Sequence, residues 1–233
     1  MNPNGVDPSM FGGLKKDLSL RRELGLEDGF LVIYAGAHGI PYDLETALKA
    51  AELLQNEEDI HFVFLGDGKE RTNLMALAES MTLRNLHFLP SIPKDQIAAT
   101  LVQADAGLAV LHTVDAYKTT YPNKVFDYMA AGLPVILAID GVVRQVVEGT
   151  GAGLFAQPGD PEAIAEVVRQ LAADPILADR LGQAGRHCVE AGFDRENFAA
   201  NMAVIMETMV AKGAGRSNDG AEAEIKSGGM DDG

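Results

Sequence analysis

The sequence is poor in cysteine, tryptophan and basic residues. Cys188 is the single cysteine, and there is no tryptophan. One cysteine cannot form an intramolecular disulfide, and no cysteine pair is present to bind zinc. Basic residues number 19 against 34 acidic ones, which gives a formal net charge of -15. Because duplex binding neutralises phosphates with Lys and Arg, this balance argues against a nucleic-acid partner.

Long apolar runs and several catalytic motifs are also missing. No stretch of about 18 or more apolar residues occurs, and the N-terminus lacks a basic-then-apolar signal pattern, so we expect a soluble, cytoplasmic chain. The sequence contains no Asp-x-Asp, no His-Glu-x-x-His and no Gly-x-Ser-x-Gly. It therefore predicts neither a metal nor a separate cofactor.

Short apolar segments alternate with amphipathic ones along most of the 233 residues. The apolar segments are bounded by Gly, Pro or Asp and predict buried strands at 30–36, 60–66, 85–89, 106–111, 134–139 and 153–156. Helical spacing predicts helices at 44–55, 70–80, 94–103, 123–131, 142–148, 161–173, 175–191 and 195–212, with a further helical region at 11–24. This alternation predicts an α/β fold, a Rossmann-like parallel sheet of about six strands with helices on both faces.

We expect one folded domain over residues 13–212. Residues 213–233 consist mainly of Gly, Ala, Ser and acidic residues, which cannot repay ordering entropy, so a disordered tail is predicted there. In parallel sheets of this kind, ligands bind beyond the carboxyl ends of the strands. The loops that follow Gly36, Gly66 and Leu89 are expected at that edge.

The most informative stretch spans residues 117–135, Tyr-Lys-Thr-Thr-Tyr-Pro-Asn-Lys-Val-Phe-Asp-Tyr-Met-Ala-Ala-Gly-Leu-Pro-Val. It predicts a polar loop, a short helix and a buried strand. Pro122 fits the first helical turn, and Asn123 offers a capping oxygen. The unpaired N–H groups that follow would face an anion together with Lys118 and Lys124. The stretch therefore predicts a phosphate site at the rim of the sheet.

Two glycine loops follow strands at the same edge. The first, Gly36-Ala37-His38-Gly39, would let the backbone approach a diphosphate, with His38 donating to a phosphate or a sugar. The alternative is a strand-end turn that needs glycine for its backbone angles. The second, Gly66-Asp67-Gly68, is a partial G-x-G element without the acidic residue that a dinucleotide fingerprint requires further on. Leu89 either offers backbone groups to a nucleobase or simply ends a strand.

These segments resemble a known family, the group 1 (family four) retaining glycosyltransferases of the GT-B fold. Its members carry a segment of the type Thr-Thr-x-Pro-Ser-Lys-x-Phe-Glu-Tyr-Met-Ala-Ala-Gly-x-Pro-Val. Residues 119–135 match it, with Asn123 in place of Ser and Asp127 in place of Glu. The closest similarity is to members that build bacterial surface polysaccharides, such as O-antigen or capsule. Segments 3–7, 34–39, 64–68 and 153–161 fit the same pattern, so the resemblance covers roughly residues 3 to 210.

The resemblance implies that the chain is the C-terminal, nucleotide-sugar-binding half of such an enzyme. Residues 1–12 would be a remnant of the interdomain linker, and an N-terminal acceptor-binding domain would be missing. The donor would be a nucleoside-diphosphate sugar, with a UDP-sugar favoured, and no metal would take part. The acceptor, a sugar or a lipid-linked sugar, would bind through the missing half, which could also attach peripherally to a membrane. The fragment alone is then expected to be inactive.

The resemblance also implies roles for particular residues. Family members often carry Arg and Lys after the first strand, where this chain has Ala37 and Tyr42. The basic side chains that bind the diphosphate would therefore be Lys118 and Lys124. These two lysines and His38 are the implied catalytic residues. The implied donor contacts are Gly36, Gly39, Gly66, Gly68, Leu89, Thr119, Thr120, Asn123 and Asp127.

One departure from the family weakens any statement about the sugar. Members of the broader group have two glutamates with seven residues between them, and this chain has Thr119 and Asp127 at those positions. Asp127 can accept from a ribose diol, or it is a solvated helix residue, whereas Thr119 supplies no carboxylate. Two other functions stay open: a GT-B epimerase of nucleotide sugars, and a non-catalytic partner domain.

Overall fold

The computed structural model describes residues 6–14, 17–26 and 28–192. Within them, six strands form one parallel sheet in the order β3-β2-β1-β4-β5-β6. Their bounds are β1 (Phe30–Ala35), β2 (Ile60–Leu65), β3 (Leu86–Leu89), β4 (Ala106–Val110), β5 (Val135–Ala138) and β6 (Gly153–Phe155). The predicted α/β fold with a six-stranded parallel sheet is confirmed. The predicted linker segment lies partly, and the predicted helix at 195–212 and the tail at 213–233 lie wholly, outside the described residues.

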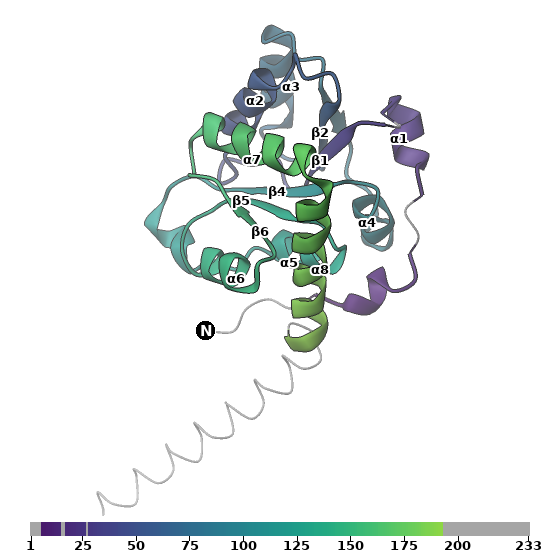
Figure 1. Cartoon of the computed structure of the whole chain (residues 1–233). Helices are drawn as coiled ribbons and strands as arrows, with labels where there is room; N and C mark the ends of the chain where they lie inside the picture. Colours follow the sequence, from purple (N-terminus) through teal and green to yellow (C-terminus); the bar gives the residue numbers. More distant parts are fainter. Residues whose placement is uncertain (1–5, 15–16, 27, 193–233) are drawn as a thin grey trace, which may run out of the picture.

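Helices cover both faces of the sheet, and each face has its own apolar core (Figure 1). One face is covered by α2 (Leu44–Leu53), α3 (Arg71–Ser80) and α7 (Pro161–Ala173). The other is covered by α4 (Lys94–Leu101), α5 (Asn123–Ala130), α6 (Val142–Thr150) and the C-terminal part of α8 (Pro175–Gly192). Strand residues alternate between the two cores, which explains why the strands read as continuous apolar runs.

The predicted helical region at 11–24 is wrong as a single helix. A 3-10 turn, η1 (Pro8–Phe11), ends at Phe11, and α1 (Ser19–Leu24) begins only eight residues later in the chain. Gly12 and Gly13 separate the two pieces, and Gly13 has a φ of +73°, which leaves the right-handed helical region. Glycine also loses more backbone entropy in a helix than other residues, so the chain breaks here.

The strand order reverses between β1 and β4. From β1 the chain builds outward to β2 and β3, and it then crosses back to add β4, β5 and β6 on the other side. β1 and β2 pair along their whole length, from Phe30 opposite Ile60 to Ala35 opposite Leu65. β1 and β4 pair only at Val32 with Ala106 and at Ile33 with Gly107. The two strands therefore separate toward their carboxyl ends, at the switch point where open α/β sheets bind ligands.

Candidate functional site

Helix α5 is anchored in the gap where β1 and β4 separate. The Tyr128 hydroxyl accepts from the Ala35 N–H at 2.8 Å and donates to the Leu108 carbonyl at 3.1 Å, so it bridges the two strands. Its ring lies where a side chain on Gly107 would be, so only glycine leaves room for it at that position of β4. Tyr128 is fully buried, and burial raises the pKa of its hydroxyl. This contact fixes α5 against the carboxyl edge of the sheet.

Lys124 lies one turn before Tyr128 on the same face of α5. Its Nζ atom is buried and makes no hydrogen bond within the described residues. The ammonium lies 3.6 Å from the centre of the Tyr34 ring, and a Cβ added to Gly36 would lie 2.9 Å from Nζ. Burial lowers the pKa of Lys124 well below its ordinary value. A desolvated ammonium without an anion is a strong reason to expect an anionic ligand here.

The two glycine loops pack backbone against backbone. A side chain on Gly66 would overlap the Gly36 carbonyl, and one on Gly68 would overlap the His38 backbone. The Gly36 N–H donates to the Leu65 carbonyl at 2.9 Å, and the His38 N–H donates to the Asp67 carbonyl at 2.8 Å. The glycines therefore permit the loops to meet, whichever backbone groups also face a ligand.

His38 is fully buried between aromatic rings. Its ring centre lies 5.9 Å from that of Tyr34, 6.2 Å from that of Phe64 and 6.1 Å from that of Phe88. Both ring nitrogens are without a hydrogen-bond partner in the described part of the chain. Burial, assisted by the positive charges of Arg71 and Lys124, lowers the pKa of His38 to about 4, so the imidazole is neutral at pH 7. A donation from His38 to a ligand would require its ring to turn out of this cluster.

Lys118 lies at the same edge, but on an exposed turn. It belongs to the 3-10 turn η2 (Asp115–Thr119) and pairs with the carboxylate of Asp115 at 2.8 Å. The hydrogen bond to Asp115 raises the pKa of Lys118. Thr119 and Thr120 are exposed beside it. A small cavity of about 110 Å³ adjoins Lys118, lined also by residues of the loops after β4, β5 and β6. The structure thus brings Lys124 to the glycine loops and leaves Lys118 on the solvent side.

The start of α5 differs from the predicted cap. Pro122 is the N-cap residue, and Asn123 is the first helical residue, with no side-chain hydrogen bond capping the helix. Pro122 has an extended backbone (φ -66°, ψ 127°), which places Asn123 inside the helix rather than before it. The predicted capping by Asn123 is therefore wrong. Asn123 is exposed, and Asp127, one turn further, is half-buried.

Leu89 ends β3 beside the second glycine loop. Its carbonyl accepts from the Gly66 N–H at 3.1 Å, so the strand end and this loop are joined. Gly39, at the end of the first loop, accepts from the Tyr42 N–H at 2.9 Å. Sequence reasoning gave no role to Tyr34 and Tyr42, which contact Lys124, or to Tyr128, which anchors the helix that carries Lys124. The available signal was their position, in or beside the two motifs already singled out.

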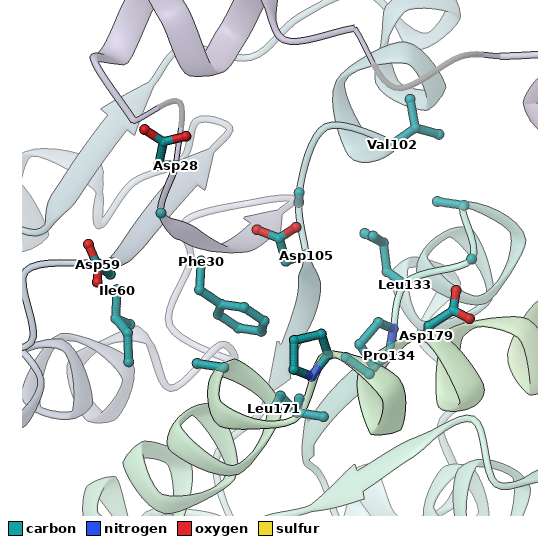
Figure 2. A pocket seen from close by; sticks show the side chains of 17 residues that line it. Asp28, Phe30, Asp59, Ile60, Val102, Asp105, Leu133, Pro134, Leu171 and Asp179 are labelled. Carbon is teal, nitrogen blue, oxygen red and sulfur yellow. The ribbon is translucent and has the colours of Figure 1, made fainter.

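A further cavity lies at the opposite, amino edge of the sheet. It has a volume of about 600 Å³ and is lined by the starts of β1, β2 and α8 (Figure 2). Its polar side chains include four carboxylates, those of Asp28, Asp59, Asp105 and Asp179. A wall of this charge disfavours a diphosphate, so cavity size alone does not locate the phosphate site.

Metal-binding clusters and membrane-spanning helices are both absent from the described residues. No group of three or more His, Cys, Asp or Glu side chains is arranged there to hold a metal ion. No helix in the same residues is both long and apolar enough to cross a membrane.

Comparison with known proteins identifies the family. The family model for glycosyl transferases group 1 matches residues 17–188, which is most of the chain. The chain belongs to this family. The predicted resemblance is therefore confirmed, and it rests on the same segments that form the glycine loops and α5.

Curated relatives include bacterial glycosyltransferases. The chain is 27% identical over 183 residues to the putative colanic acid biosynthesis glycosyl transferase WcaI of Escherichia coli, covering 77% of the chain and 44% of that protein. It is 26% identical to a GDP-mannose-dependent phosphatidylinositol monomannoside mannosyltransferase of Corynebacterium glutamicum, covering 88% and 55%. The chain thus spans about half the length of the curated relatives it matches.

Solved structures show the same fold. Anabaena HepE in complex with UDP and glucose superposes with a TM-score of 0.78 at 18% identity, covering 89% of this chain and 56% of that one. The C-terminal domain of a group 1 family glycosyl transferase (LpcC) from Francisella tularensis gives a TM-score of 0.67 at 17% identity, covering 82% of this chain and 99% of that one. At these identities the likeness establishes the fold, that of the C-terminal Rossmann-like half of GT-B proteins.

Proposed function

We propose that this chain is the donor-binding half of a glycosyltransferase that transfers a glycosyl unit from a nucleoside-diphosphate sugar. A UDP-sugar is the favoured donor, and the sugar or lipid-linked acceptor would bind to a further domain. The length of the curated relatives supports this division, because the chain covers 44% and 55% of two of them. The glycosyl transferases group 1 family model, which matches residues 17–188, supports glycosyl transfer over the two alternatives, an epimerase and a non-catalytic partner domain.

The single observation that carries the proposal is the buried Lys124 ammonium beside Gly36. Nζ is desolvated, has no hydrogen-bond partner among the described residues, and lies at the first turn of α5. A diphosphate placed between the first glycine loop and α5 would supply the missing negative charge. The positive end of the helix dipole would add to this attraction.

In the proposed reaction, the protein's contribution is electrostatic. Bond cleavage at the donor sugar leaves negative charge on the departing diphosphate, and Lys124 would stabilise that charge in a site shielded from water. Lys118, half exposed on η2, would reach the outer phosphate after releasing Asp115. We further propose retention at the sugar carbon and no need for a divalent metal. Asp127 would accept from the ribose diol. Leu89 and the second glycine loop would lie near the base. Thr119, Thr120 and Asn123 would lie at the entrance to the diphosphate site.

The His38 ring is buried among aromatic side chains, so its imidazole does not face the proposed diphosphate position. The main contribution of His38 in this arrangement is through the backbone. The His38 carbonyl accepts from the Glu70 N–H at 2.9 Å, and the two glycine loops are thereby held in one position. Direct donation by the imidazole stays a prediction.

The test is thermal stabilisation of the full chain by UDP, GDP, ADP and their sugars, because preferential binding to the folded state raises the melting temperature. We expect one nucleotide to raise it, Lys124→Ala to abolish the shift and Lys118→Ala to reduce it. Lys49→Ala, at an exposed position on α2, is the matched control and should leave the shift unchanged. No shift with any nucleotide, or a full shift in Lys124→Ala, would contradict the proposal.

A further inference from the structure

The ammonium of Lys124 lies between two tyrosine rings. Nζ is 3.6 Å from the centre of the Tyr34 ring and 4.3 Å from the centre of the Tyr42 ring. The two rings meet edge to face with their centres 6.2 Å apart. A cation over an aromatic face is attracted by the ring quadrupole, most strongly where water is excluded. We call this pair of rings the tyrosine cradle.

The two walls of the cradle are not equivalent. Tyr34 is fully buried on β1, and its hydroxyl donates to the Ala37 carbonyl at 2.7 Å, so it also fixes the first glycine loop. Tyr42 is half-buried in the segment between β1 and α2, with its N–H bonded to the Gly39 carbonyl at 2.9 Å. Tyr42 is therefore the wall nearer to solvent. Its ring can be replaced without removing a buried hydrogen bond of the core.

Two opposing effects act on the charge of Lys124. Burial favours the neutral amine and lowers the pKa, whereas the two ring faces favour the charged ammonium. The titratable groups that face Lys124 are Tyr34, Tyr42 and His38. The imidazole is neutral at pH 7, and the hydroxyl pKa of Tyr34 is raised by burial, so neither brings a counter-charge. Among the described residues, the two rings are the groups seen to offset the desolvation of Nζ.

We propose that Tyr42 is a positioning residue for the donor site: with Tyr34, its ring keeps the Lys124 ammonium charged and held against Gly36 before any ligand is present. The absence of a side chain on Gly36 gives the ammonium its space, since a Cβ there would lie 2.9 Å from Nζ. The two ring faces of the cradle thus stabilise the ammonium in place of a carboxylate side chain. This inference rests on the proposed function, because the ligand it prepares for is the donor diphosphate.

Two variants separate the ring from the space that it fills. Tyr42→Phe keeps the aromatic face, whereas Tyr42→Leu keeps an apolar wall and removes the face. With lysine labelled at Cε by ¹³C, and the signal of Lys124 assigned by Lys124→Arg, the NMR titration reports its protonation directly. We expect Tyr42→Phe to titrate like the wild type and Tyr42→Leu to lose its proton at lower pH. Identical titrations in the two variants would overturn the cradle.

Calorimetry with UDP between pH 6 and 10 tests the link to binding. We expect Tyr42→Phe to bind within about twofold of the wild type, and Tyr42→Leu about tenfold more weakly at pH 8, a change of ~1.4 kcal/mol. As the pH is raised, the affinity of Tyr42→Leu should begin to fall at a lower pH than that of the wild type, because Lys124 loses its proton earlier in this variant. A general packing defect would weaken binding equally at every pH and leave the Lys124 titration unchanged, which would refute the positioning role.

The two measurements distinguish the failure of this inference from that of the proposed function. If the wild type binds no nucleoside diphosphate, the donor-site role falls together with the proposed function, whatever the titration shows. If the wild type binds UDP but Tyr42→Leu and Tyr42→Phe behave alike, the proposed function stands and the role of Tyr42 is refuted. Melting curves without ligand verify that both variants are folded.

Discussion

Removing the Tyr128 hydroxyl should destabilise the chain by about 2 kcal/mol. In Tyr128→Phe the buried Ala35 N–H and Leu108 carbonyl lose their shared partner, which is 2.8 Å from one and 3.1 Å from the other. Each orphaned buried group costs about 1–3 kcal/mol, with the carbonyl toward the lower end. Part of this cost, about 1–3 kcal/mol, is offset in the variant, because folding no longer requires a hydroxyl group to be removed from water. The net estimate of about 2 kcal/mol follows from these opposing effects.

Urea unfolding at 25 °C measures this change. With a slope of about 2 kcal/mol per molar, the midpoint should fall by about 1 M while the slope stays the same. Tyr117→Phe is the matched control, because Tyr117 is half-buried on η2 and a substitution there is expected to stay within about 0.5 kcal/mol. If Tyr128→Phe unfolds at the same urea concentration as Tyr117→Phe, the bridge between β1 and β4 contributes no stability and the reasoning is refuted.

Three further outcomes are expected. Gly66→Ala should cost more than about 4 kcal/mol, because its Cβ would overlap the first glycine loop at a φ of +148°, whereas Gly149→Ala, with open space around it, should not destabilise; melting temperatures decide. The pKa of His38 is about 4 in the folded chain and ~6.5 in the unfolded chain, so the free energy of unfolding should fall by about 3 kcal/mol as the pH is lowered from above 6.5 toward 4. In His38→Leu this part of the pH dependence should disappear; if its free energy of unfolding varies with pH in parallel with the wild type, the prediction is wrong. Arg21→Met should cost about 3 kcal/mol in urea unfolding, because it removes a buried guanidinium that pairs with the half-buried Asp105 carboxylate and donates to the Gln103 and Gly29 carbonyls, and a change below about 1 kcal/mol would count against this.

The strands were predictable because burial on both faces leaves a local signature. Each strand is an apolar run bounded by Gly, Pro or Asp, and β1 to β6 all lie within two residues of the predicted ranges. Helices α2 to α7 were predictable for the same reason, since one face of each meets an apolar core. The broken region at 11–24 was not, because two glycines outweighed a helical spacing that the surrounding residues supported.

Contacts between distant segments could not be predicted from the sequence. The Tyr128 bridge joins α5 to strands that precede it by many residues, and its position depends on where β1 and β4 separate. The close packing of Gly66 against the first glycine loop, which leaves no room for a side chain, likewise arises only once β1 and β2 are paired in register. For the first loop the sequence left ligand approach and a strand-end turn open, and it gave no sign that the two loops contact each other, because the contact joins segments that are distant in the chain.

Helix α5 joins the stability of the sheet to the geometry of the candidate site. On one side, Tyr128 ties it to β1 and β4; on the other, it packs along α8, where Gly182 and Gly185 permit a close approach. A side chain on Gly182 would overlap the Gly132 carbonyl at the end of α5. A helix held on both sides has little freedom to slide. We therefore expect any adjustment of Lys124 to the proposed donor to take place within its own side chain, in the tyrosine cradle, and not through a shift of α5.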